Sequence, residues 1–389
     1  MGIEGSNPSL SEFICMKQAK KKLIIFAGGG TGGHVYPILA VYEYLKEYNN
    51  LDFLYFCSEG KIEEKICQEN NIKSVILPLV GGLPRGFSFG LLAWFFKLIY
   101  SSFLAIKFLA FSLEFKQYQK VVFSTGGYGS APILLAANLL GIPYILHNLD
   151  SHLGLANQVF ADKAQVLTYG MNPLENKFLP KNGSIIISGN PVAKAFKQNI
   201  SPEEKSRIIE KYKLDSNRKT LIITGGSQGS QFLNKIILEI VPNLIRDNWQ
   251  IIHQLGSKQF QIFQDKFINN PNYKPQEYIN DLALLYSISD LAITRSGAMT
   301  ISELISKKLP SILIPLPTSA QNHQFYNAKF LADQGCVLLL EQKPLNPEAL
   351  IEKINFVYSK KALFKLGFKE IDFTDSAKLL GNIILKSLY

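Results

Sequence analysis

The sequence predicts an α/β protein of two domains, each built on a parallel sheet wrapped by helices. The chain has 389 residues, too many for one ordinary core and suited to two domains of roughly 150 to 200 residues. Short apolar runs alternate with longer segments of helical period, which is typical of parallel sheets. In addition, a strand followed by a glycine turn and a helix start opens each half, at Phe26 to His34 and at Ile223 to Ser230.

Apolar runs bounded by turn residues are the predicted strands. Those of the first half are residues 23–29, 52–58, 74–79, 120–127, 144–147, 165–170 and 184–189. Those of the second half are residues 220–226, 250–256, 291–297, 311–317 and 336–341. Pro191 breaks the period within Gly189 to Phe196, so this segment is the predicted linker. We expect the active site in the cleft where the carboxyl ends of both sets of strands face each other.

Composition narrows the classes of partner and of site. The net charge of +10 favours an anionic partner, whether nucleic acid, a phosphorylated substrate or acidic lipid. The cysteines show no CxxC spacing and the histidines no paired metal spacing, so we expect a reducing cytoplasm and no structural metal. Residues 1–15 lack the features of a signal peptide and precede a second methionine, Met16, so we expect a dispensable extension.

Two glycine turns follow strands in the first half. The segment Gly28 to Pro37 lets a ligand approach the backbone, with free amides expected to point into the cleft. It lacks the lysine of a Walker loop and fits the dinucleotide pattern poorly. A second turn, Ser124 to Pro132, falls on the same sheet edge, although tight helix packing would explain its glycines equally well.

His34 closes the first turn and is a candidate general base, because imidazole titrates near neutrality. The alternative is a histidine at a helix start that bonds only to backbone. The position alone gives both interpretations equal weight.

Polar residues also follow two glycine turns of the second half. Ser227 and the amides after it stand at a helix start suited to a diphosphate. In Arg295 to Glu303, a glycine turn precedes Thr300 and Ser302, and Glu303 is expected to accept both hydroxyls of a ribose. A capped helix stabilised by its dipole is the alternative.

The segment Gln321 to Ala328 follows a predicted strand and carries side-chain amides. Gln324 and Asn327 are expected to bond sugar hydroxyls. Solvated loop residues are the alternative, because most polar loop residues have no further role.

The segment from Leu83 to Lys120 is strongly apolar and carries five basic residues against one acid, Glu114. Lys97 and Lys107 interrupt it, leaving stretches of about ten residues where a spanning helix needs about twenty. We therefore expect an interfacial helix that meets anionic membrane lipids. A helical hairpin of the core is the alternative.

In order and spacing, the motifs of both halves closely resemble those of the MurG family of N-acetylglucosaminyltransferases, which complete lipid II for peptidoglycan. The matching motifs are GGGTGGHVYP, STGGYGSAP, LHNLDSHLGLAN, GNPV, GGSQGS, YINDLALLYSISDLAITRSGAMTISE and HQFYNA, between about Leu23 and Gly335. The resemblance implies a GT-B fold, in which two Rossmann-like domains with parallel sheets face an interdomain cleft. It also implies inverting, metal-independent transfer of GlcNAc from UDP-GlcNAc to the muramyl 4-hydroxyl of lipid I. The protein would be peripheral at the cytoplasmic face of the bacterial inner membrane, with no cofactor and no nucleic-acid partner.

The resemblance further assigns residues of the site. The donor site of the family falls on Thr31, Gly32, Gly33, Ser227, Ile279 near uracil, Ala298, Met299, Thr300, Ile301, Ser302 and Glu303 around ribose and phosphates, and Gln324 at the sugar. His34 matches a family histidine near the acceptor, where it would be a base or an acceptor contact.

Two departures from the family pattern concern the cleft. Where the family has HEQN, this chain has His147, Asn148, Leu149 and Asp150, and we hypothesise that Asp150 takes over the role of the acid. The arginine that follows GNPV in the family is Ala193 here, and Lys194, one position on, lacks the two-pronged hydrogen bonding of guanidinium.

The expected organisation is an acceptor and membrane-binding domain over residues 16–188 and a UDP-GlcNAc-binding domain over residues 189–372. Residues 373–389 are expected to form a C-terminal helix that packs back on the first domain. Three other functions remain open: a glycolipid synthase with a diacylglycerol acceptor, a UDP-GlcNAc epimerase, and a catalytically silent UDP-sugar-binding protein.

Overall fold

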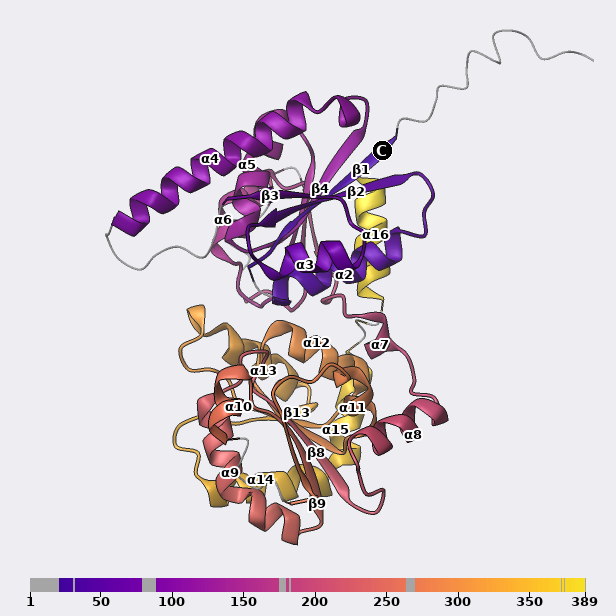
Figure 1. Ribbon diagram of the computed structural model, residues 1–389, viewed down its shortest axis with the longest axis vertical. Coiled ribbons are helices and arrows are strands. Elements are labelled where there is room, and N and C mark those ends of the chain that lie inside the picture. The colour runs from indigo at the N-terminus through magenta and orange to yellow at the C-terminus, as the bar shows by residue number, and fades with distance from the viewer. Residues whose placement is uncertain are drawn as a thin grey trace, which may run out of the picture.

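The computed structural model describes residues 21–30, 32–78, 89–174, 180–181, 183–263, 270–371, 373 and 375–388. They form two α/β units, which lie one above the other in Figure 1. Each unit has its own parallel sheet. The predicted class of two α/β domains is confirmed.

Seven parallel strands form the sheet of the first unit, in the order β3-β2-β1-β4-β5-β6-β7. They are β1 (Lys22–Gly28), β2 (Leu51–Ser58), β3 (Ser74–Leu77), β4 (Gln119–Gly126), β5 (Tyr144–Asn148), β6 (Val166–Tyr169) and β7 (Ser184–Ile187). All seven strands predicted for the first half are found. The strand order reverses between β1 and β4, so the two glycine turns that follow these strands lie together at the switch point, the usual ligand position of such sheets.

Helices cover both faces of this sheet. They are α2 (Gly32–Leu45), α3 (Ile62–Glu69), α4 (Phe89–Phe111), α5 (Ala131–Leu140) and α6 (Leu155–Phe160). Successive side chains of β1 enter opposite cores: Ile24 and Phe26 pack with α2, and Leu23 and Ile25 pack on the side of α4 and α5. A strand that is apolar on both faces is typical of a parallel sheet covered by helices.

The end of the chain returns to the first unit. Helix α16 (Ser376–Lys386) packs along α2, as Figure 1 shows. Leu380 and Ile384 join the buried cluster that contains Val41, and the Tyr44 hydroxyl donates to Asn382 Oδ1 at 3.2 Å. The last helix is therefore part of the core of the first unit.

Six parallel strands form the second sheet, in the order β10-β9-β8-β11-β12-β13. They are β8 (Lys219–Thr224), β9 (Trp249–Gln254), β10 (Tyr273–Gln276), β11 (Leu291–Thr294), β12 (Ser311–Leu313) and β13 (Val337–Leu339). The prediction of five strands here is wrong by one, because β10 is polar and contains Pro275. It lies at the edge and pairs only with β9, a position that tolerates proline.

The second unit repeats the arrangement of the first. Its helices are α7 (Lys194–Lys197), α8 (Pro202–Lys211), α9 (Gln231–Arg246), α10 (Ser257–Phe263), α11 (Leu282–Ile288), α12 (Ala298–Lys307), α13 (His323–Asp333), α14 (Pro347–Ser359) and α15 (Lys361–Gly367). Short 3-10 turns are η1 (Leu113–Phe115), η2 (Tyr128–Ser130), η3 (Ala161–Lys163), η4 (Ala320–Asn322) and η5 (Phe368–Glu370). The strand order reverses between β8 and β11, so the turns that begin α9 and α12 lie together.

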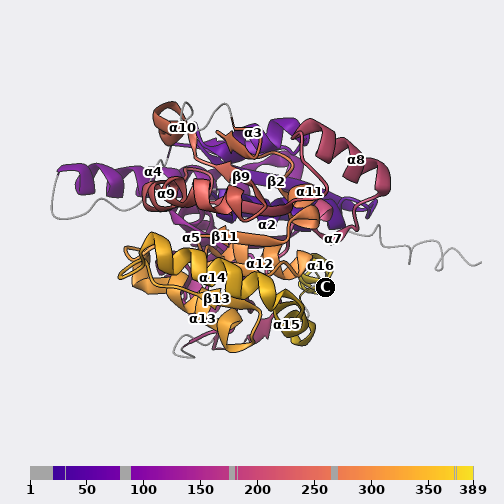
Figure 2. The same cartoon turned by 90° about the horizontal axis from the view of Figure 1, so that it is seen from below.

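Helix α4 is one continuous helix of 23 residues that runs through Lys97 and Lys107. The alternative of a helical hairpin is therefore wrong. Among the helices of the described residues, α4 is the one long and apolar enough to cross a membrane by length and composition, with 22% of its most apolar window buried. It packs on α5 and projects beyond the rest of the molecule in Figures 1 and 2.

Candidate active site

Two cavities open at the carboxyl ends of the two sheets. The first, of about 320 Å³, is lined from both units: His34, Thr125, Tyr128, Asn148 and Asp150 come from the first unit, and Ala320, Gln321 and His323 from the second. The second, of about 780 Å³, lies within the second unit and is lined by Gly226, Ser230, Arg295, Thr300 and Gln324, among others. The predicted cleft therefore contains adjoining sites from both units.

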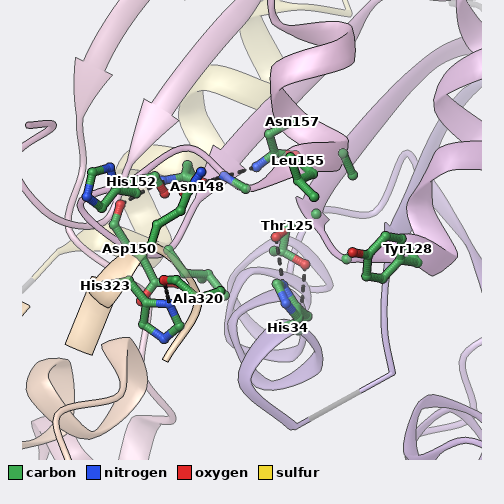
Figure 3. Close-up of a pocket in the computed structure, with 16 residues that line it drawn as sticks. His34, Thr125, Tyr128, Asn148, Asp150, His152, Leu155, Asn157, Ala320 and His323 are labelled. Atoms are coloured by element: carbon green, nitrogen blue, oxygen red, sulfur yellow. Dashed lines mark hydrogen bonds between the residues drawn. The ribbon is translucent and has the colours of Figure 1, made fainter. Parts of the chain in front are cut away.

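His34 lies in the first turn of α2, on the wall of the first cavity (Figure 3). Its Nδ1 lies 2.9 Å from the Thr125 carbonyl oxygen, and the Thr125 hydroxyl donates to the His34 carbonyl at 2.7 Å. A carbonyl only accepts, so Nδ1 carries the hydrogen and Nε2 keeps its lone pair. The ring is thus held in the tautomer that a general base needs.

The two glycine turns of the first unit touch through their backbones. Gly126 and Gly127 adopt φ of 84° and 82°, which favours glycine. A Cβ on Gly127 would lie 2.8 Å from the Gly29 carbonyl oxygen and 3.5 Å from His34 Cδ2. Glycine at this position lets the second turn close against the first.

Asn148 organises the loop that carries Asp150. Its Nδ2 donates to the carbonyl oxygens of Asp150 at 2.6 Å and His152 at 2.9 Å, and its Oδ1 accepts from Gly154 N at 3.1 Å. This asparagine stands where the resemblance led us to expect a carboxylate. Its hydrogen bonds within the loop account for its presence.

Asn327 bridges the two units. Its Nδ2 donates to Asp150 Oδ1 at 2.8 Å, and its Oδ1 accepts from the amide and the hydroxyl of Ser151, each at 3.2 Å. The side chain is completely buried. The expectation that Asn327 bonds a sugar hydroxyl is therefore corrected, because both ends of its amide are occupied by the interface.

A second bridge joins the units through Asn190. Its Oδ1 lies 3.0 Å from His147 Nε2, and its Nδ2 donates to the Leu149 carbonyl at 3.0 Å and to Ser302 Oγ at 3.1 Å. Burial lowers the pKa of His147 to about 4, so this histidine is neutral near pH 7. Sequence reasoning did not single out Asn190, since only the fold brings these residues together.

Arg295 is a buried cation beside the second cavity. It follows β11 and is 7% exposed. Its guanidinium donates to Ser230 Oγ, Gln342 Oε1 and the carbonyls of Ile314 and Pro315, at 2.8 to 3.2 Å. These acceptors are neutral, and burial lowers its pKa to about 10. Sequence reasoning took Arg295 only as the start of a motif, although arginine is a residue type that suits phosphate recognition.

Ser227 lies beside the second cavity, whereas Gln324 lines it. Ser227 is exposed in the turn before α9, next to the lining residue Gly226. Gln324 lines the cavity, and its Oε1 accepts a hydrogen bond from the Leu316 amide at 3.0 Å. The NH₂ group is therefore the end of this side chain that can donate to a ligand. Ser230, which sequence reasoning passed over, caps α9 by accepting from Leu233 N at 3.4 Å.

The residues assigned in α12 separate into two groups. Thr300 lines the second cavity, and Glu303 is half-buried, with its pKa raised to about 8 by burial. Ile301 lies in the hydrophobic core, and Ser302 donates its hydroxyl to the Ala298 carbonyl at 2.9 Å. Ile301 also donates its amide to the Gly297 carbonyl at 3.0 Å, so these two buried residues support the helix and do not face the cavity.

The remaining assigned residues are placed as follows. Gly32 and Gly33 begin α2, Ala298 begins α12, Met299 packs partly against the core, and Ile279 is buried with its amide donated to Gln254 Oε1 at 2.9 Å. Lys194 is exposed at the start of α7. Thr31 lies outside the described residues. Within the described residues, no group of three or more His, Cys, Asp or Glu could hold a metal ion.

Two family models match the two units. The glycosyltransferase family 28 N-terminal domain matches residues 24–167, and the family 28 C-terminal domain matches residues 220–373. The solved structure of Acinetobacter baumannii MurG is 26% identical, with a TM-score of 0.70 over 94% of this chain and 99% of that one. The fold and the cleft thus define a family 28 glycosyltransferase of GT-B architecture.

Curated relatives narrow the class. The UDP-N-acetylglucosamine--N-acetylmuramyl-(pentapeptide) pyrophosphoryl-undecaprenol N-acetylglucosamine transferase of Natranaerobius thermophilus is 33% identical, over 93% of this chain and all of the relative. That of Borreliella afzelii is 31% identical, over 95% of this chain and 98% of the relative. The chain belongs to this family of N-acetylglucosamine transferases.

Proposed function

We propose that the chain transfers GlcNAc from UDP-GlcNAc to the muramyl 4-hydroxyl of lipid I, giving lipid II with inversion at the sugar. The names of its relatives supply the donor and the acceptor. The observation that carries the proposal is the orientation of His34, whose free Nε2 adjoins a cavity lined from both units. A base in a shared cleft is what transfer between two bound substrates requires.

The donor occupies the second unit in this proposal. Thr300 and Gln324 line the cavity there and bond the phosphates and the sugar. Glu303 accepts the ribose hydroxyls in its ionised form. Ile279 contributes an apolar contact to uracil, with its own amide already bonded to Gln254.

Departure of UDP places negative charge on the β-phosphate, and the second cavity holds positive groups for it. Amides at the starts of α9 and α12 carry partial positive charge. Arg295 adds a full charge held in place by neutral oxygens, so it needs no reorganisation during the reaction. These groups supply the stabilisation of the leaving group from the chain's own residues.

The acceptor hydroxyl attacks from the side of the first unit. As the bond to UDP breaks and the sugar gains oxocarbenium character, His34 Nε2 takes the proton of the hydroxyl. The Thr125 carbonyl then faces an imidazolium and stabilises its charge through the Nδ1 hydrogen bond. Attack opposite to the leaving UDP gives the inverted product.

We further propose that α4 holds the protein at the cytoplasmic face of the bacterial inner membrane as a peripheral protein. Seven of its apolar side chains are more than half exposed: Phe89, Leu92, Phe96, Ile99, Tyr100, Phe103 and Phe111. We call these residues the apolar surface of α4. Lys97 and Lys107 are exposed on the same helix, Lys107 one turn after Phe103, and suit anionic headgroups. Lys120 is not available for this contact, because its ammonium group donates to the Leu109 carbonyl at 3.0 Å.

The test is transfer of labelled GlcNAc from UDP-GlcNAc to a lipid I analogue by the purified protein. The reaction is run with EDTA and, separately, with a Glu303→Ala variant. Product that forms in EDTA and is lost in the variant supports the proposal. Binding of UDP-GlcNAc without transfer by the wild-type protein contradicts it and favours a silent relative.

A further inference from the structure

Glu63 is a buried carboxylate outside both cavities. It is the second residue of α3 and is completely buried. Its Oε2 accepts from Gly30 N at 3.3 Å, and its Oε1 accepts from Ser58 N at 3.2 Å. A buried carboxylate is costly unless it is hydrogen-bonded, so these two amides explain how the fold tolerates it.

The Gly30 amide belongs to the first glycine turn, four residues before His34. Gly30 adopts φ of 89°, and its amide points at Glu63, so this amide of the turn is not free for a ligand. A Cβ on Gly29 would collide with Glu63 Oε1. The carboxylate therefore lies directly against the backbone of the turn.

The opposite side of the same turn meets the second glycine turn. A Cβ on Gly127 would lie 2.8 Å from the Gly29 carbonyl. The backbone at Gly29 is thus enclosed between Glu63 on one side and Gly127 on the other. A Cβ on Gly127 would also lie 3.5 Å from His34 Cδ2, so the second turn passes close to the His34 ring and a shift of the first turn alters the setting of His34.

We propose that Glu63 is a positioning residue for the transfer: it fixes the first glycine turn against the second and thereby sets His34 at the cavity. The inference rests on the proposed function. Glu63 touches no substrate and acts through the turn. Its removal leaves the donor cavity of the second unit intact and reduces the rate of the chemical step.

Glu64 provides a matched control. It is the next residue of the same helix and also binds a backbone amide, accepting from Gly60 N at 3.1 Å through Oε2. That amide belongs to the loop directly before α3 and does not reach the glycine turn. Both residues lie in the first turn of α3, so a general loss of helix stability would affect both variants.

The experiment compares Glu63→Gln and Glu64→Gln in the full chain by kcat, KM for UDP-GlcNAc, Kd for UDP and Tm. The glutamine keeps the size but offers one acceptor oxygen to two amides. We expect Glu63→Gln to lower kcat about tenfold or more, because small misplacements of a reacting group are costly. Kd for UDP should stay within about twofold in both variants, because UDP occupies the second unit in the proposed function, and kcat should stay so in Glu64→Gln.

An unchanged kcat in Glu63→Gln, or an equal loss of UDP affinity, overturns the inference. If Glu63→Gln does not fold, Gly29→Ala tests the same contact from the other side, since its methyl group displaces the carboxylate. Gly29→Ala should lower kcat, and adding Glu63→Asp, which withdraws the carboxylate by one methylene, should restore part of it. Unchanged kcat in Gly29→Ala, or no recovery in the double variant, contradicts the inference. Failure of the proposed function would be distinct, because the wild-type protein would then give no transfer.

Discussion

Asp150 and Asn327 join the two units across the cleft through a hydrogen bond of 2.8 Å between Oδ1 and Nδ2. Asp150 belongs to the loop after β5, and Asn327 belongs to α13. The same asparagine binds Ser151 with its other end, so one buried amide connects to two consecutive residues of the first unit. The structure gives Asp150 a role in holding the units together, in addition to its place on the cavity wall.

Two substitutions of Asp150 distinguish its role in joining the units from a role as a catalytic acid. Asp150→Ala removes an acceptor from a buried donor and should lower the free energy of unfolding by about 1.5 to 3 kcal/mol, the usual range for a hydrogen bond to a charged group. Asp150→Asn keeps an oxygen for Asn327 and should retain most stability and transfer. Denaturant unfolding and kcat check this. A fall in kcat of about 100-fold or more in Asp150→Asn would instead support the acid role.

His34→Gln tests the proposed base. Glutamine can still bond the Thr125 carbonyl but cannot take up a proton, so we expect kcat to fall about 100-fold to 10,000-fold. KM for UDP-GlcNAc should change little, because the His34 side chain lines the first cavity, whereas Thr300 and Gln324 line the second. Steady-state kinetics with varied donor measure both. Retention of more than about a third of wild-type kcat would show that another group accepts the proton.

Donor affinity should depend on pH through Glu303. Burial raises the pKa of this carboxyl to about 8, so the neutral form prevails at pH 7. Ribose hydroxyls donate to the ionised form, whose fraction rises about tenfold between pH 7 and pH 9 for such a pKa. Kd for UDP should therefore fall by up to that factor over this range. Glu303→Gln should bind UDP more weakly and without this trend, and calorimetry at several pH values makes the comparison.

Buried neutral histidines should make the protein less stable in mild acid. Burial lowers the pKa of His253 to about 3, whereas an unfolded histidine titrates near 6.5. Below pH 6.5 the unfolded state binds a proton at this histidine that the folded state does not bind. The free energy of unfolding therefore decreases as the pH is lowered. His253 contributes up to about 1.4 kcal/mol per pH unit to this slope.

The variant His253→Gln tests this expectation. Its side-chain amide can still form hydrogen bonds with Tyr273 and Asn234 but does not titrate. Urea unfolding between pH 4.5 and 7.5 should show a smaller acid slope than in the wild-type protein. Parallel curves for the two proteins would contradict the expectation.

Charges on the apolar surface of α4 should weaken membrane binding. Phe96 and Ile99 are 71% and 64% exposed, and burial of each in lipid is worth roughly 1.5 to 3 kcal/mol. The double variant Phe96→Glu and Ile99→Glu should therefore bind anionic vesicles at least about tenfold more weakly. Leu363→Glu, 61% exposed on α15 of the second unit, is the control. Equal effects of both changes in a vesicle sedimentation assay would exclude α4 as the membrane contact.

Most of the fold could be predicted because its strands are continuous apolar runs between turns. The exceptions have physical causes. β10 is an edge strand that pairs with one neighbouring strand, so it tolerates polar residues and Pro275. The hairpin alternative for α4 failed because nothing in the segment breaks the helix: Lys97 and Lys107 interrupt the apolar run, but lysine is a good helix former and leaves the backbone hydrogen bonds intact.

The site was harder to predict because its residues meet only in the folded chain. The glycine turns and His34 could be found, since each stands directly after a strand. The partners of Asn327 and Asn190 lie on distant segments of the chain, so sequence patterns could not indicate that these amides join the units. Glu63 reads as an ordinary acid at a helix start, and only the contact with Gly30 distinguishes it from Glu64.

The return of the chain to the first unit determines how the molecule can open. The polypeptide crosses between the units near Gly189 and again near Phe373, and a Cβ on Gly189 would lie 2.5 Å from Phe373 Cβ. The two crossings are therefore side by side. We expect any opening of the cleft to be a rotation about this point, because separation of the units would require α16 to leave its contacts with α2. We then expect substrates to enter, and products to leave, on the side of the cleft away from the two crossings.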